Sequence, residues 1–208
     1  YEIKKFKDRF LPKHVQKSLS QLSWNSGHSY KDVTILFADI VGFTAYSSGK
    51  PPKMVVNMLS ELFMDFDKMC NTFKVFKVYT IGDCYVVLNN LESRDSPKTE
   101  AQIMFEFAEK LIGIIQKVKL KINFDGLNMR IGIHTGYIIG GIVGTDIVRF
   151  DIYGENVWVG NKMESAGEAG KICVSEYTKS LLERNGLSRY RFYFNKEITV
   201  PQNNKKIN

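Results

Sequence analysis

The spacing of hydrophobic and polar residues along this chain alternates between the period of a strand and that of a helix. Residues 33–40, VTILFADI, form a nearly continuous run of strand formers with one acid near its end. After Pro51 and Pro52, apolar residues recur every three or four positions, which predicts a first helix. These residues are Val55, Met58, Leu59, Leu62, Phe63, Phe66 and Met69.

The middle of the chain predicts a hairpin and a second helix. In residues 74–88, KVFKVYTIGDCYVVL, two β-rich runs flank Gly82 and Asp83, which places the acid at the hairpin tip. A helix is predicted over about 99–119, because five apolar residues share one side of it. They are Ile103, Phe107, Leu111, Ile114 and Ile115.

Shorter runs predict the remaining elements. Residues 128–134 predict a strand, and the glycines that follow predict a further hairpin reaching residues 150–152. A third helix is predicted after Gly154, a short strand over 172–174, and a fourth helix that Ser175 caps. The glycines of the predicted hairpin are Gly136, Gly140, Gly141 and Gly144.

The order strand, helix, strand, strand, helix, strand is that of the ferredoxin-like split βαβ fold. We therefore predict an α+β domain with a βαββαβ palm-type sheet and a C-terminal αβ extension. Both main helices should cover one face of an antiparallel sheet, which leaves the opposite face for a partner or ligand. The predicted limits are 1–30 for a linker or docking helix, 31–195 for this domain, and 196–208 for a polar, basic tail.

Composition narrows the class of protein only slightly. The 208 residues carry a formal charge of +7, which favours polyanionic partners, but much of the excess lies in lysine-rich ends that are typically solvated. By charge alone these partners could be nucleotides, nucleic acid or an anionic membrane face; we expect a nucleotide and no nucleic acid. Three cysteines without CxxC spacing indicate neither a disulfide framework nor a zinc site, and predict a reducing, cytosolic setting.

No apolar run approaches the roughly 20 residues that a membrane helix needs. The chain starts at Tyr1 without a signal-peptide pattern, which indicates a piece of a longer protein. We expect a cytoplasmic domain of a longer, membrane-anchored protein.

Two acids, Asp39 and Asp83, should meet in this fold, because the first strand lies beside the hairpin. Adjacent carboxylates remain ionised together when a cation lies between them. Mg²⁺ prefers carboxylates together with waters and phosphate oxygens, and two ions about 3.5–4 Å apart can clamp an in-line displacement at phosphorus. The pair therefore predicts a metal site; the alternative is that Asp39 only caps a turn.

The turn at residues 40–44, IVGFT, has the features of a phosphate-binding segment. Its backbone N–H groups, at Gly42 and Phe43 among others, and the Thr44 hydroxyl can hold phosphate oxygens if a helix follows. Gly42 permits a close approach.

Four segments together resemble the catalytic domain of class III nucleotidyl cyclases. They are FADIVGFT at 37–44, YTIGDCYVV at 79–87, MRIGIHTGYIIGGIVG at 129–144 and FDIYGENVWVGNKMESAGEAGKICVS at 150–175. The resemblance covers about 33–182, in the family's order and spacing, and FLPKHV at 10–15 resembles the segment that enters such domains.

This resemblance implies a dimeric enzyme that converts a nucleoside triphosphate into a 3′,5′-cyclic monophosphate and pyrophosphate. Asp39 and Asp83 would hold two Mg²⁺ ions, for which Mn²⁺ can substitute, and the Ile40 carbonyl would add a ligand. One ion would activate the ribose 3′-hydroxyl for attack on the α-phosphorus. Arg130 matches an arginine that grips the phosphates, a task that suits a guanidinium; the alternative is a solvated strand residue.

The chain departs from self-sufficient members of this family at three positions. Trp158 and Lys162 stand where an Asn and an Arg would position the ribose and stabilise charge at phosphorus, and neither supplies the same hydrogen bonds. Tyr79 replaces a base-reading Lys or Glu, whereas Asp151 matches the adenine-reading aspartate. All four residues would face a degenerate second site.

Intact metal acids with a lost Asn and Arg resemble the first catalytic half of two-domain membrane cyclases. The working site would then need a complementary cyclase domain, in a heterodimer or an intramolecular pseudo-heterodimer. The segment NKMESAGEAGKICVS resembles more closely the metal-bearing half of two-domain guanylyl cyclases from unicellular eukaryotes, and this resemblance implies GTP as substrate in preference to ATP. Three alternatives are an adenylate cyclase, a nucleotide-binding module without turnover, and a palm-like polymerase or other phosphotransferase.

Overall fold

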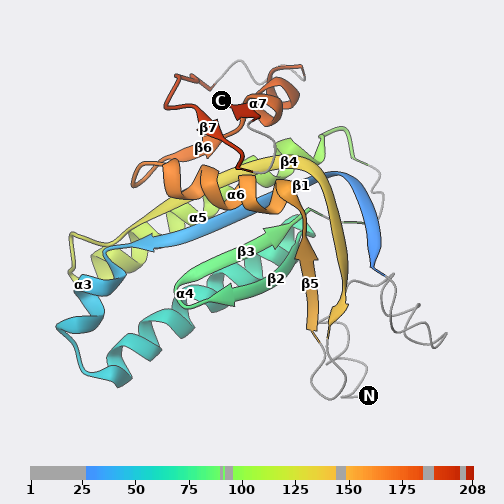
Figure 1. Cartoon of the computed structure of the whole chain (residues 1–208). Helices are drawn as coiled ribbons and strands as arrows, with labels where there is room; N and C mark the ends of the chain where they lie inside the picture. The colour runs from blue at the N-terminus through green and yellow to red at the C-terminus, as the bar shows by residue number, and fades with distance from the viewer. Residues whose placement is uncertain (1–26, 90, 92–95, 144–148, 185–189, 202–204) are drawn as a thin grey trace.

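The computed structural model describes residues 27–89, 91, 96–143, 149–184, 190–201 and 205–208. The predicted N-terminal helix and the FLPKHV segment lie outside these residues. The described part contains a six-stranded sheet and a separate two-stranded sheet near the C-terminus (Figure 1). None of its helices combines the length and hydropathy that a membrane-spanning segment requires.

The large sheet has the order β2-β3-β1-β4-β5, and β6 pairs with β4 in parallel. Its strands are β1 (His28–Val41), β2 (Phe76–Ile81), β3 (Cys84–Leu88), β4 (Asn128–Val143), β5 (Arg149–Tyr153) and β6 (Ile172–Val174). The order β4-β1-β3-β2 within it, with antiparallel pairing throughout, is that of a ferredoxin-like sheet. The predicted α+β fold class is therefore confirmed.

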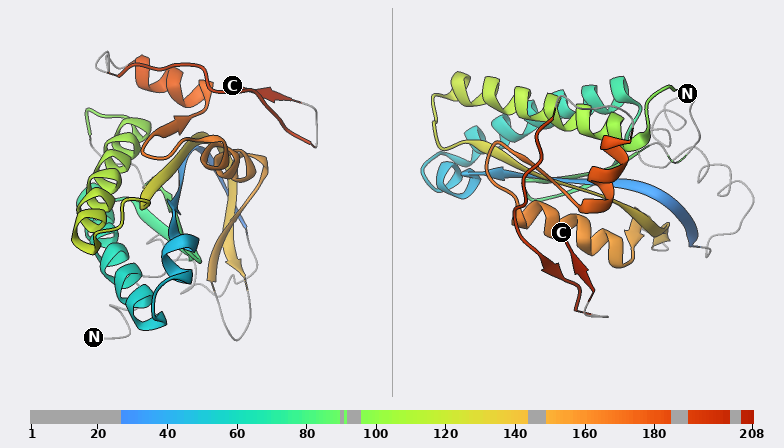
Figure 2. Two further views of the ribbon diagram at one scale, coloured as in Figure 1. Left: turned by 90° about the vertical axis from the view of Figure 1, so that its left-hand side faces the viewer. Right: turned by 90° about the horizontal axis from the view of Figure 1, so that it is seen from above.

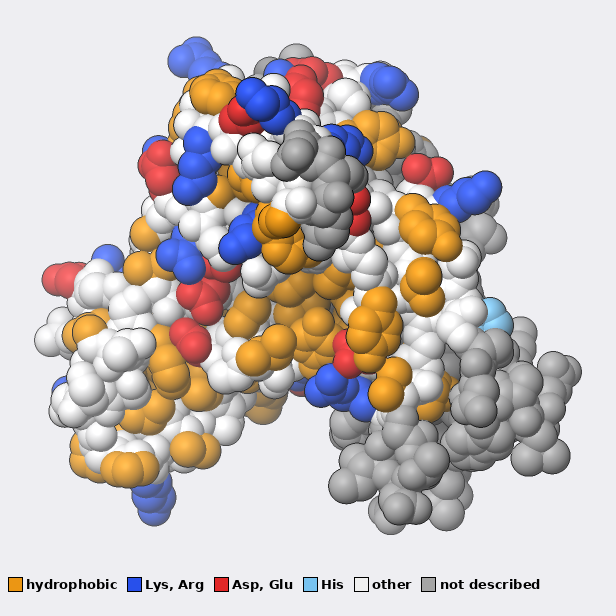
Figure 3. Space-filling model, viewed as in Figure 1, with side chains coloured by type: hydrophobic (Ala, Val, Ile, Leu, Met, Phe, Trp, Pro, Cys, Tyr) orange, Lys and Arg blue, Asp and Glu red, His pale blue; other side chains and the backbone are white. Residues whose placement is uncertain are grey.

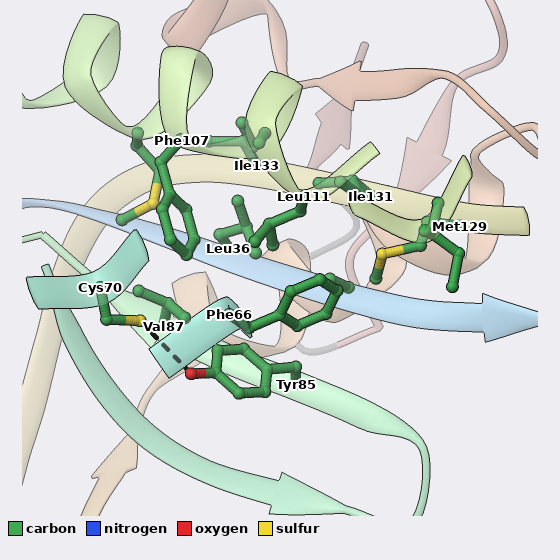
Figure 4. Close-up of a cluster of buried hydrophobic side chains, with 14 of the residues drawn as sticks. Leu36, Phe66, Cys70, Tyr85, Val87, Phe107, Leu111, Met129, Ile131 and Ile133 are labelled. Atoms are coloured by element: carbon green, nitrogen blue, oxygen red, sulfur yellow. Dashed lines mark hydrogen bonds between the residues drawn. The ribbon is translucent and has the colours of Figure 1, made fainter. Parts of the chain in front are cut away.

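Two long helices, α4 (Pro52–Phe73) and α5 (Glu100–Ile122), cover one face of the sheet. Figure 2 shows both on one side of the strands and α6 (Glu155–Ala166) on the other. The predicted helices begin as expected: Pro52 opens α4, and the Thr99 side chain caps α5 in a capping box with Gln102. Apolar residues from these helices and from β1, β3 and β4 form the main core (Figure 4).

The opposite face of the sheet was expected to need a partner or ligand, and this is wrong for part of it. Helix α6 packs against β4 and β1 there. Helix α6 lies so close to the sheet that a Cβ on Gly132 of β4 would collide with the backbone of Glu164. A Cβ on Gly160 of α6 would lie 3.2 Å from the Phe37 ring of β1. The chain itself therefore covers the middle of this face.

The prediction that a strand ends at residue 134, before a glycine-rich hairpin, is also wrong. Strand β4 runs on to Val143, through three of the predicted turn glycines. Gly136 lies against the Asn156 side chain, and a Cβ on Gly140 would lie 2.7 Å from the Phe150 ring. These glycines therefore permit close packing within a strand.

The ends of the domain differ in detail from the predicted limits. β1 begins at His28, inside the range 1–30 assigned to the linker. The range 196–208 assigned to a polar tail contains β7 (Ile198–Thr199), β8 (Lys206–Ile207) and the fully buried Val200. Val200 packs against Val159 and Met163 of α6, so this segment contributes to a small core. The described residues also include two shorter helices, α3 (Phe43–Ser48) and α7 (Glu176–Glu183).

The buried side chain of His134 on β4 forms hydrogen bonds that connect this strand to α6 and to the start of α7. His134 Nδ1 lies 2.7 Å from the Ser175 hydroxyl, which caps α7, and Nε2 lies 2.8 Å from the Asn156 amide oxygen on α6. Because the Asn156 amide nitrogen donates to the Tyr137 carbonyl, its oxygen is left to accept from His134. Both ring nitrogens of the neutral imidazole are therefore satisfied without a metal.

Burial lowers the pKa of His134 below its ordinary value, against the effect of the Asn156 hydrogen bond. Since the unfolded chain then binds a proton more readily than the folded chain, stability should be complete above about pH 6.5 and fall as the pH drops below it. We expect the loss to approach about 1.4 kcal/mol per pH unit. Urea unfolding between pH 7.5 and 5.5 measures it; His134→Gln should flatten this dependence and His28→Gln should retain it.

Candidate active site

Asp39 and Asp83 lie at the same end of the sheet. β1 pairs with β3 as far as Ala38 opposite Tyr85, so Asp39 follows this pair directly and Asp83 occupies the turn before β3. Both side chains are partly exposed. Burial is the main cause that raises the pKa of Asp83, and the negative charge of Asp39 raises it further. The two carboxylates are therefore near enough for their charges to interact.

The donors around this pair suit a hard cation. Among the described residues, no group of three or more His, Cys, Asp and Glu side chains could hold a metal ion. Further ligands would have to be carbonyls, waters or phosphate oxygens, which is the ligand set of Mg²⁺. The neighbouring Cys84 is held as a thiol, because burial and the Asp39 charge raise its pKa to about 12.

The turn after β1 has a backbone that requires glycine. Gly42 has φ 83°, and a Cβ there would collide with the Gly126 carbonyl. It is the N-cap of α3, which begins at Phe43, and the Thr44 side chain is exposed. The first N–H groups of α3 have no partner within the helix. The predicted phosphate-binding residues therefore come shortly after Asp39 and Ile40, which are the predicted metal ligands on this strand.

Arg130 lies opposite Asp39 across the β1–β4 pair. Its Nη2 is 3.2 Å from Asp39 Oδ2, and its Nε is 2.5 Å from Glu164 Oε1. Arg130 is therefore not a solvated strand residue: it joins a metal-site acid to a buried acid on α6. Glu164 was not among the residues predicted for the site, although it lies within a segment that carries the resemblance.

The four residues assigned to a second site form two pairs. The pKa of Tyr79 is raised to about 12, mainly by burial and then by the charge of Asp151. Arg149, which the sequence analysis missed, lies between them: its Nη2 is 2.6 Å from Asp151 Oδ2, and its guanidinium is 5.4 Å from the centre of the Tyr79 ring.

On α6, the Lys162 ammonium lies 5.4 Å from the centre of the Trp158 ring. Trp158 and Lys162 therefore face the same side of the helix, one turn apart, as a cation–π pair.

The face of the molecule in Figure 3 is hollowed, and hydrophobic side chains gather in the hollow. A separate cavity of about 180 Å³ lies between the end of α6, α7 and the segment around residues 191–198. None of the predicted site residues lines this cavity.

Comparisons with known proteins show which family this chain resembles. Residues 26–207 match the adenylate and guanylate cyclase catalytic domain. A guanylate cyclase of Toxoplasma gondii is 39% identical over 198 residues, which are 92% of this chain and 4% of that protein. Guanylate cyclase alpha of Plasmodium falciparum is 37% identical over 186 residues, which are 88% of this chain and 4% of that protein.

Among solved structures, the guanylate cyclase domain of RhGC from Catenaria anguillulae, in complex with GTP, has a similar fold, with a TM-score of 0.73 and 25% sequence identity. The similarity covers 86% of this chain and 95% of that one. The chain thus corresponds to one domain of such proteins, and it spans only about 4% of the length of the two curated relatives.

Proposed function

The chain belongs to the adenylate and guanylate cyclase catalytic domain family, as its sequence resemblance predicted, and from this we propose that it is the metal-binding half of a dimeric nucleotidyl cyclase. The reaction joins the ribose 3′-oxygen to the α-phosphorus and releases pyrophosphate. The observation that carries the proposal is the interacting pair Asp39 and Asp83 beside the glycine turn and Arg130.

Each of these residues has a distinct task in the proposed site. Asp39, Asp83 and the Ile40 carbonyl would hold the two Mg²⁺ ions, or Mn²⁺ in their place. When bound, these ions acidify the 3′-hydroxyl and offset negative charge on the triphosphate. The backbone of Gly42 and Phe43 and the Thr44 hydroxyl bind phosphate oxygens.

Arg130 adds charge-assisted hydrogen bonds to the phosphates. In the present structure Asp39 Oδ2 accepts a hydrogen bond from Nη2 of this arginine. A phosphate oxygen of the bound nucleotide would compete with Asp39 for that N–H group.

A complementary domain is needed because the other half of the site is not intact in this chain. Asp151 binds Arg149, and the side chain of Trp158 lies against Lys162 where the catalysis of the family uses an Asn and an Arg. The partner would supply the base-reading pair, the Asn and the Arg.

We propose GTP as the substrate, with ATP as the alternative. The support is that both curated relatives described above are guanylate cyclases at 37–39% identity. Comparing cyclic GMP and cyclic AMP yields at equal concentrations of the two nucleotides decides between them.

The chain alone should form no cyclic nucleotide above background, and mixing it with a cyclase domain that carries the base-reading pair, the Asn and the Arg should restore turnover. Product is measured by chromatography with Mg²⁺, with Mn²⁺ and with a chelator, which should abolish it. The partner domain alone is the control. An assembled dimer that binds metal and nucleotide without cyclisation would instead support a non-catalytic module, and a linear product would point to a polymerase-like enzyme.

We also propose that the chain is a cytoplasmic domain of a longer, membrane-anchored protein. Its small share of the relatives' length supports the longer protein. Fractionation of the full-length protein with membranes tests the anchor.

A further inference from the structure

A buried carboxylate stands behind the phosphate-binding arginine. Glu164, in the last turn of α6, is only 4% exposed. Burying a carboxylate is costly unless it is paired. Its Oε1 accepts a hydrogen bond from Arg130 Nε at 2.5 Å, and its Oε2 lies 3.2 Å from the Ser165 hydroxyl.

The fold brings Glu164 to this position through a glycine contact. Gly132 lies two residues after Arg130, on the same face of β4, because side chains alternate along a strand. With no Cβ at Gly132, the backbone of α6 at residues 163–164 lies directly on the strand. Glu164 is therefore held by backbone packing, and only the end of its side chain reaches out to Arg130.

The two acids that contact Arg130 differ in kind. Glu164 is buried, and its Oε1 lies 2.5 Å from Arg130 Nε. Asp39 is 27% exposed, and its Oδ2 lies farther from the guanidinium, at 3.2 Å from Nη2. A guanidinium has five N–H donors in a fixed plane. A partner fixed on Nε therefore sets the direction of the two terminal nitrogens, which remain available to Asp39 or to an anionic ligand.

We propose that Glu164 is a positioning residue that orients the Arg130 guanidinium toward the triphosphate. This inference rests on the proposed function of Arg130. Glu164 contacts no reacting atom, and its effect on nucleotide binding passes entirely through Arg130.

A double-mutant cycle tests this in the complex of the chain with a complementary domain, with a non-hydrolysable GTP analogue as the probe. Arg130→Ala should weaken binding of the analogue by about 10- to 100-fold, the range of a charge-assisted hydrogen bond. Glu164→Gln should weaken it by about tenfold, as loss of an orienting partner does. In the double variant, affinity should equal that of Arg130→Ala alone.

The matched control is Glu168→Gln, which makes the same change four residues later. Glu168 is exposed and pairs with Lys171, so this variant should bind the analogue as the parent does. Circular dichroism and melting temperatures establish that each variant is folded. If Glu164→Gln does not fold, Glu164→Asp keeps the charge but shortens its reach, and it should also weaken binding.

The outcomes separate the two claims. If Arg130→Ala leaves affinity unchanged, the phosphate-binding role in the proposed function fails. If Arg130→Ala weakens binding while a folded Glu164 variant has parental affinity, or if the two effects multiply in the double variant, the positioning role of Glu164 is overturned.

Discussion

Replacing either metal-site acid, by Asp39→Ala or Asp83→Ala, should reduce cyclic nucleotide formation in the assembled dimer by at least about a thousandfold, because both carboxylates are needed to hold the ions that activate the 3′-hydroxyl. The two variants should differ in stability. Asp83 is repelled by Asp39, so its removal relieves an unfavourable interaction and should leave the melting temperature unchanged or slightly higher. Asp39 also pairs with Arg130, so its removal should lower the melting temperature modestly.

Turnover is measured by chromatography under saturating Mg²⁺, and melting is followed by circular dichroism. Asp65→Ala is the matched control, since Asp65 pairs with Lys68 on the outer surface of α4 and touches none of the site residues. Its activity should equal that of the parent. Parental turnover in either metal-site variant would rule out the two-metal site.

The position of these two acids could be predicted from the sequence because it depends only on topology. The helix α4 buries Met58, Leu62 and Phe66, one residue per turn, and this periodicity is visible without any structure. Once the helices and the hairpin are recognised, their order fixes β1 beside β3. The end of β1 and the turn before β3 then meet in any version of this fold.

The surroundings of Arg130 could not be predicted in the same way. Helix α6 lacks a strong apolar face: its buried residues are Val159, Gly160, Met163 and Glu164. It packs on the sheet through glycines, and a glycine in a sequence indicates a turn as readily as a close approach. The same ambiguity led to the wrong end for β4.

The second site shows another limit of sequence patterns. Tyr79 and Asp151 were both expected to face the second site, whereas the Arg149 side chain, which contacts both and belongs to the same strand as Asp151, was not predicted there. Their pairing follows from the side-chain direction of residues two apart in a strand, which place Arg149 and Asp151 on one face. Matching a sequence to a family motif does not reveal a neighbouring residue such as Arg149 when the motif assigns no function to its position.

Gly132→Ala should be the most damaging single change outside the metal site. An added Cβ would overlap the backbone of Met163 and Glu164, and backbone atoms cannot rotate away as a side-chain end can. Helix α6 would have to move off β4, at a cost of about 3 kcal/mol or more. The shift would also withdraw Glu164 from Arg130, so we expect weaker nucleotide binding in whatever fraction remains folded.

Gly113→Ala is the matched control for this change. Gly113 lies in α5, and a Cβ there would meet no atom within 4 Å. Because alanine is favoured over glycine inside a helix, this variant should gain up to about 1 kcal/mol in the free energy of unfolding. Urea denaturation of both variants measures the contrast. Equal stability of Gly132→Ala and the parent would show that the position of α6 does not depend on this contact. Glycine would then occupy these positions of β4 for a reason other than close packing.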